Sequence, residues 1–102
     1  MSMLHTVNKS PFERNALESC LRLAQSGSAV LLMEDGVYAA LAGTDKSALV
    51  ETRRGDLKFH VLAADLDARG LAEKPLIDGV ETVDYAGFVD LVADNDAMQA
   101  WL

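Results

Sequence analysis

One cysteine and two histidines are the side chains of this sequence best suited to chemistry. Cys20 is the only thiol in 102 residues, and His5 and His60 are the only imidazoles. A single cysteine excludes an internal disulfide, a cysteine-rich zinc site and a paired-cysteine redox motif. The remaining roles for Cys20 are a thiol that carries sulfur as a persulfide, a thiol at a subunit contact, or a small core residue.

The position of Cys20 argues against strong activation of its thiol. Apolar residues at 16, 17, 20, 21, 23 and 24 follow the helical period and predict a helix over 12–25. Cys20 lies more than two turns into that helix, on a face shared with Leu17. A reactive thiolate needs exposure and a lowered pKa, usually from a helix N-terminus or a nearby cation. The sequence gives Cys20 neither.

The histidines and the paired carboxylates give weaker signals. Two histidines without a third convergent ligand do not make a metal site, so neither a metal nor a cofactor is predicted. His5 and His60 lie within predicted strands, where we expect buried, hydrogen-bonded rings. The alternative is that one of these rings faces a cleft and transfers protons there. Glu34 and Asp35 can do acid–base chemistry, but Asp35 is also well placed to cap the next helix.

The elements that must position these residues alternate between strands and helices. Strands are expected at 3–7, 29–33, 57–63, 80–83 and 97–102. Helices or helical turns are expected at 12–25, 37–42, 45–54, 65–69 and 85–93. The run from Ala29 to Met33 is continuously apolar, which is typical of a parallel strand covered on both faces. We therefore predict one small three-layer α/β/α domain over residues 1–102, with a mostly parallel central sheet of about five strands.

In such a sheet, functional groups collect beyond the carboxyl ends of the strands. Three predicted loops reach that edge, and a site should be assembled from them: residues 8–12, 34–38 and 64–67. Ser10 is expected to cap the helix that follows the first loop, with Pro11 in its first turn.

The net charge of −7 is unevenly distributed. Residues 75–102 carry six acidic side chains and no lysine or arginine. This disfavours direct contact with nucleic acid and leaves either a solvated acidic face or a surface for a basic partner. The N-terminus lacks the pattern of a signal peptide, and no apolar run is long enough to span a membrane. We therefore expect a soluble, cytoplasmic protein.

Several segments, in order and along the whole length, resemble the DsrH/TusB family. They are Met3–Phe12, Glu34–Ala40, Asp65–Leu71, Val83–Val89 and Gln99–Leu102. Each segment alone is a weak match, but their order and spacing make the resemblance specific.

The resemblance implies a subunit of a sulfur-relay complex. In this family, the chain joins DsrE-like and DsrF-like subunits (TusD-like and TusC-like in the other branch) in a heterohexamer with two copies of each chain. The complex passes sulfane sulfur as a cysteine persulfide, with a DsrC/TusE-like carrier protein downstream. The principal sulfur-carrying cysteine belongs to the DsrE/TusD-type chain. The resemblance thus favours an accessory subunit of a sulfurtransferase complex over an enzyme in its own right.

Cys20 distinguishes the two branches of the family. Its context, Leu17-Glu18-Ser19-Cys20-Leu21, resembles DsrH proteins, where a cysteine is typical, and is not typical of TusB proteins. This favours a DsrEFH-type subunit in cytoplasmic dissimilatory sulfur oxidation, with Cys20 as the candidate persulfide carrier. The alternatives are a TusB-like subunit of the relay for 2-thiolation of tRNA wobble uridine, a purely structural subunit with an inert Cys20, or a lone enzyme or ligand-binding domain.

Overall fold

The protein is described by a computed structural model that covers residues 2–102. All five expected strands form, each with its predicted ends to within one residue. The elements in chain order are β1 (Met3–Val7), α1 (Ala16–Leu23), β2 (Ala29–Leu32), the 3-10 helix η1 (Glu34–Ala40), α2 (Ser47–Arg53), β3 (Lys58–Leu62), α3 (Ala63–Ala68), β4 (Glu81–Val83), α4 (Tyr85–Asp94) and β5 (Ala97–Trp101).

The strands form a single parallel sheet in the order β4-β3-β2-β1-β5. β2 lies at its centre and is buried along its whole length, as its continuous apolar run predicts. The first and last strands are neighbours, with Met3 opposite Ala97 and Val7 opposite Trp101. Thus β5 forms one edge of the sheet and β4 forms the other.

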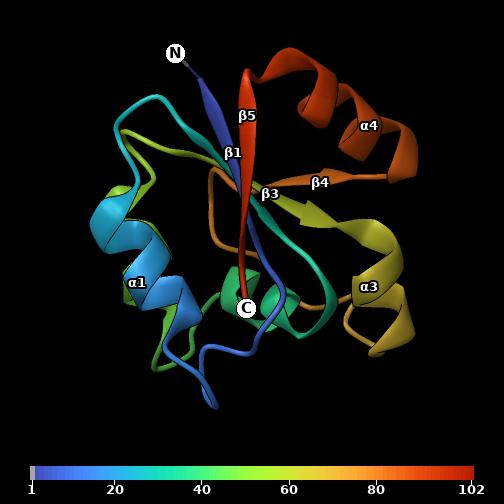
Figure 1. Cartoon of the computed structure of the whole chain (residues 1–102). Coiled ribbons are helices and arrows are strands. Elements are labelled where there is room, and N and C mark those ends of the chain that lie inside the picture. Colours follow the sequence, from blue (N-terminus) through green and yellow to red (C-terminus); the bar gives the residue numbers. More distant parts are fainter. Residues whose placement is uncertain (1) are drawn as a thin grey trace.

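Helices cover both faces of the sheet, which confirms the predicted α/β class (Figure 1). Side chains on β2 alternate, with Val30 and Leu32 in a larger core and Leu31 in a smaller one. The larger core is closed by α1, η1 and α2, and the smaller core by α4, through Phe88 and Leu91. The larger core also contains Val7, Leu17, Cys20, Leu21, Val37, Val50, Phe59 and Val61.

The first helix starts later than its sequence predicts. Ser10 does not cap it; its carbonyl accepts from the amide of Arg14 at 3.0 Å, and its Oγ accepts from the amide of Phe12 at 3.2 Å. These bonds close a separate turn after β1, and α1 begins at Ala16 with no side-chain cap from Asn15. The prediction of a helix from residue 12 is therefore wrong by about one turn.

Candidate functional site

The three segments predicted at the carboxyl edge of the sheet come together, but two of them are helical: residues 34–38 lie in η1 and residues 64–67 in α3. The carboxylate of Asp65 accepts from the amide of Glu34 at 2.6 Å, and Arg69 Nε donates to Asp35 Oδ1 at 3.0 Å. Glu34 has a φ of +49°, a left-handed conformation that L residues rarely adopt. The bond from Asp65 thus holds a strained residue at the start of η1.

The start of η1 also touches the end of β1, through Gly36. A Cβ placed on Gly36 would lie 2.1 Å from the carbonyl oxygen of Val7. That oxygen also accepts from the amide of Met33 at 3.0 Å, so the chain turns back directly against the end of β1. Only a residue without a side chain fits this approach.

The acidic pair at residues 34 and 35 does not perform the predicted capping. Met33 occupies the N-cap position of η1 without a side-chain bond, and the carboxylate of Asp35 is paired with Arg69. A cavity of about 280 Å³ opens beside this pair; Ser10, Phe12 and Tyr38 are among its lining residues. Its lining holds neither a thiol nor an imidazole.

Cys20 lies away from these loops, inside the larger core. Its side chain is 0% exposed, and burial raises its pKa to about 12, despite the opposing charge of Arg53. At neutral pH the thiol is protonated and shielded from solvent. The structure therefore brings together the three predicted segments, with η1 and α3 in place of two of the expected loops, but does not bring Cys20 to them.

His5 is buried and hydrogen-bonded, as expected, with a partner that sequence analysis missed. Trp101 Nε1 donates to His5 Nδ1 at 3.0 Å, which joins β1 to the end of β5. The two residues line a cavity of about 350 Å³ on the α1 side of the sheet. Because Nδ1 accepts a hydrogen bond, His5 is neutral with its proton on Nε2.

We expect the contact between His5 and Trp101 to weaken in acid. Burial lowers the pKa of His5 from 6.5, so the folded state resists protonation. The stability that neutral His5 contributes is therefore present above pH 6.5 and is lost as the pH falls below it. Trp101→Phe should lower the free energy of unfolding by about 1 kcal/mol at pH 7.5 and by less at pH 5.5. Urea unfolding followed by circular dichroism measures both values, and an equal loss at both pH values would contradict the prediction.

His60 departs from its prediction. Its Nδ1 is buried without a hydrogen-bond partner and lies 3.9 Å from Glu81 Oε2. Burial lowers the pKa of His60, and the charge of Glu81 partly offsets this. Across residues 2–102, no three histidine, cysteine or acidic side chains gather as a metal site would require.

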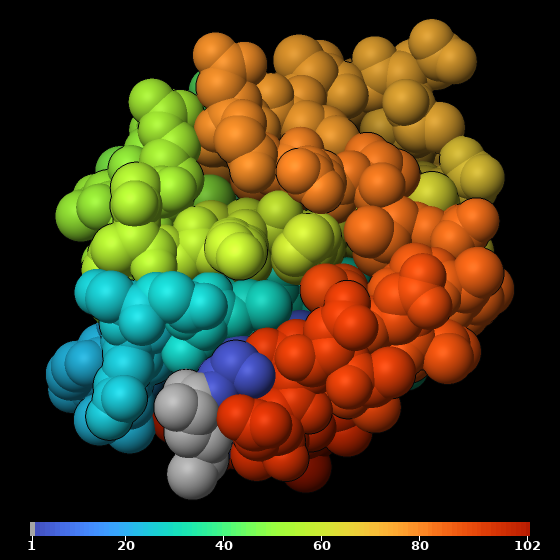
Figure 2. Space-filling model, turned by 90° about the horizontal axis from the view of Figure 1, so that it is seen from above, coloured from blue at the N-terminus to red at the C-terminus, as the bar shows by residue number. Residues whose placement is uncertain are grey.

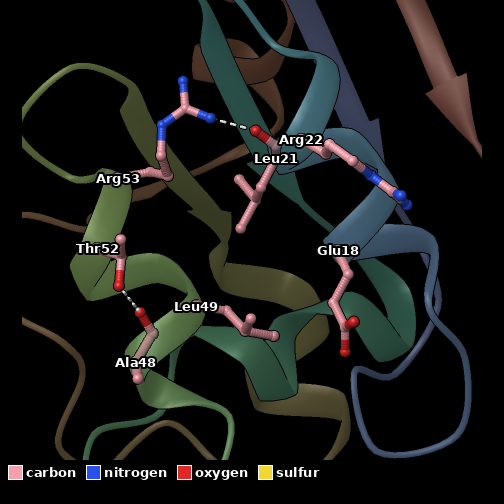
Figure 3. A pocket seen from close by; sticks show the side chains of 7 residues that line it. All are labelled: Glu18, Leu21, Arg22, Ala48, Leu49, Thr52 and Arg53. Atoms are coloured by element: carbon pink, nitrogen blue, oxygen red, sulfur yellow. Dashed lines mark hydrogen bonds between the residues drawn. The ribbon is translucent and has the colours of Figure 1, made fainter.

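A groove of about 540 Å³ runs between α1 and α2 (Figure 3). Arg53 reaches across it from α2, donating to the carbonyls of Leu21 and Ala24 and to the carboxylate of Asp56. The hydrogen bond from Arg53 is also the main reason that the pKa of Asp56 is lowered. This guanidinium satisfies the last carbonyls of α1, so its role is structural.

Comparisons with known proteins agree with this architecture. A family model described as DsrH like protein matches residues 9–98. Protein TusB of Pectobacterium parmentieri is 37% identical and Protein TusB of Erwinia tasmaniensis 39% identical, each over 97% of this chain and 100% of the relative. The crystal structure of the ychN protein from E. coli has a TM-score of 0.85 at 23% identity, with 98% of each chain covered.

The parallel sheet and the likeness to the ychN protein define a small parallel α/β domain. The chain belongs to the DsrH/TusB family. This confirms the family that the five sequence segments indicate. Within the described residues, no helix has both the length and the apolar character to cross a membrane.

Proposed function

We propose that this chain is the TusB-like subunit of a cytoplasmic sulfur relay for 2-thiolation of tRNA wobble uridine. It would join TusC-like and TusD-like subunits in a heterohexamer that hands sulfur to a TusE-like carrier. The observation that carries this proposal is the end-to-end similarity to proteins named TusB, at 37–39% identity. It favours the TusB branch over the sulfur-oxidation branch that Cys20 alone indicates.

Within the complex, we propose a structural role for this chain. Sulfur transfer requires attack by a thiolate, and the thiol of Cys20 is both protonated and buried. The carboxylates at the loop edge are engaged with Arg69 and with the amide of Glu34. The uneven acidic charge is unsuited to holding tRNA, so that contact would fall to another protein.

A second candidate function is the relay of dissimilatory sulfur oxidation, with DsrE-like and DsrF-like partners and a DsrC-like carrier. The observation that favours it is the cysteine at position 20, in a context typical of DsrH proteins. In that case Cys20 would be a persulfide carrier. A local opening of α1 would then be needed to expose its thiol.

One experiment tests both roles. The chain is co-expressed with its TusC-like and TusD-like partners in cells that lack their own TusB, and 2-thiouridine in tRNA is measured by mass spectrometry. We expect the wild type and Cys20→Ala to restore thiolation equally, because the cysteine only fills space. Loss of thiolation with Cys20→Ala in an intact complex would contradict the structural role. Failure of the wild type to bind either partner would overturn the proposed function itself.

A further inference from the structure

The helix α4 is apolar on nearly its whole circumference. Eight of its ten residues are apolar or glycine, and none of the ten is buried within the chain. Phe88 and Leu91 face the smaller core, whereas Tyr85, Val89 and Val92 point outward and are 61%, 65% and 43% exposed. A helix that is apolar all round is normally buried on all sides. The outer side of α4 is instead exposed, with no other part of residues 2–102 packed against it.

The sheet edge formed by β5 adds to this exposed surface. β5 carries the sequence Ala-Met-Gln-Ala-Trp, with Met98 54% exposed. It has no charge and no proline, which are the usual devices that protect an edge strand. In Figure 2 the orange-to-red part of the chain, which holds both elements, forms one continuous side of the molecule.

The charge around α4 indicates what can cover it. Asp90 and Asp94 on the helix are exposed, and neither forms an ion pair with any of residues 2–102. No lysine or arginine occurs anywhere in residues 75–102. A second copy of this chain would bring like charges together, which disfavours it as the occupant. A partner with an apolar centre and a lysine- or arginine-rich rim would complement both the helix and its acids.

We infer that the outer side of α4 (Tyr85, Val89 and Val92) is the surface through which this chain binds a partner subunit. The partner presents an apolar patch with a basic rim that reaches Asp90 and Asp94 farther around the same helix. We call the outer side of the helix the α4 surface. This inference rests on the proposed function, because it assigns the TusC-like or TusD-like chain as the occupant. It adds which side of the molecule binds and which chemistry the partner must supply.

The inference is tested with two matched variants of the full chain. Val89→Arg places a cation at the centre of the α4 surface. Leu23→Arg places one on α1, which covers the opposite face of the sheet, at a residue that is 66% exposed. Both changes are to a good helix former, so both variants should fold like the wild type by circular dichroism. We expect Val89→Arg to weaken binding to the co-purified partner subunits about tenfold or more, and Leu23→Arg by less than about twofold.

A charge variant tests the basic rim separately. Asp90→Asn with Asp94→Asn removes two charges and leaves the apolar centre intact. We expect the association rate with the partner subunits to fall, and the salt dependence of binding to become weaker. An unchanged salt dependence would overturn the basic rim.

The possible outcomes separate the surface from the function. If the wild type binds its partners and Val89→Arg binds equally well, the α4 surface is overturned while the proposed function stands. If the wild type binds neither partner, both fail. If light scattering shows that the chain alone is a dimer, and Val89→Arg dissociates that dimer, the occupant is a second copy and the inference is overturned.

Discussion

Replacing Gly36 with alanine is expected to lower the free energy of unfolding by about 3 kcal/mol. The new Cβ would lie 2.1 Å from the carbonyl oxygen of Val7, so η1 has to move away from the end of β1. That movement would also strain the bond between Asp65 and the amide of Glu34, which fixes the start of η1. Urea unfolding of the two proteins measures the loss.

Gly55→Ala is the matched control for this change. A Cβ at Gly55 meets no atom within 4 Å, and its backbone is not left-handed. We expect its free energy of unfolding to stay the same or rise by about 0.5 kcal/mol, because alanine restricts the unfolded chain. Equal losses for both variants would show that the contact with Val7 does not determine the cost.

The thiol of Cys20 is expected to resist alkylation in the folded protein. Its pKa is about 12, compared with 9.0 for an unperturbed thiol, so its thiolate fraction near pH 8 is lower by about a thousandfold. Complete burial slows the reaction further. Iodoacetamide should therefore modify the native chain at least a thousandfold more slowly than the chain in urea, as intact mass measures.

Because folding raises this pKa, the stability that the neutral thiol contributes is full below pH 9 and is lost as the pH rises toward 12.

A relocated thiol gives the control for alkylation. Leu23→Cys in a Cys20→Ala background places the only thiol at an exposed position on the same helix. That thiol should react at nearly the same rate in the native and the unfolded chain. If the native Cys20 reacts as fast as this exposed thiol, α1 opens readily and the persulfide-carrier role regains its physical basis.

Much of the fold is predictable from the sequence, because its strands are short apolar runs with clear stops. The run Ala29–Met33 indicates a buried central strand, and the apolar period within 85–93 indicates a helix. The period does not identify the face on the sheet, because Phe88 and Leu91 pack there while Val89 is exposed. Asp84 caps that helix, since its Oδ1 accepts from the amide of Gly87 at 2.8 Å, and aspartate is a favoured residue at this position. These features depend on neighbours along the chain, which a sequence displays directly.

The candidate site is less predictable, because its contacts join distant residues. Topology alone gives the three segments at the carboxyl edge, since parallel strands end at one side, but not that two of them are helical. The pairing of Asp35 with Arg69 spans 34 positions and leaves no local pattern, so capping is the natural but wrong prediction. The bond from Trp101 to His5 spans 96 positions. This hydrogen bond can be predicted only after the pairing of β1 with β5 is known.

The pairing of β1 with β5 has a consequence for the order in which the molecule folds. Every residue pair in this ladder is separated by 94 positions, so closing it costs more chain entropy than any other strand pairing in the sheet. We expect β5 to join last and to detach first, with the fastest amide hydrogen exchange of the five strands. A partner bound beside it would slow that exchange. Binding of a partner would then stabilise the fold of this subunit, in addition to forming the complex.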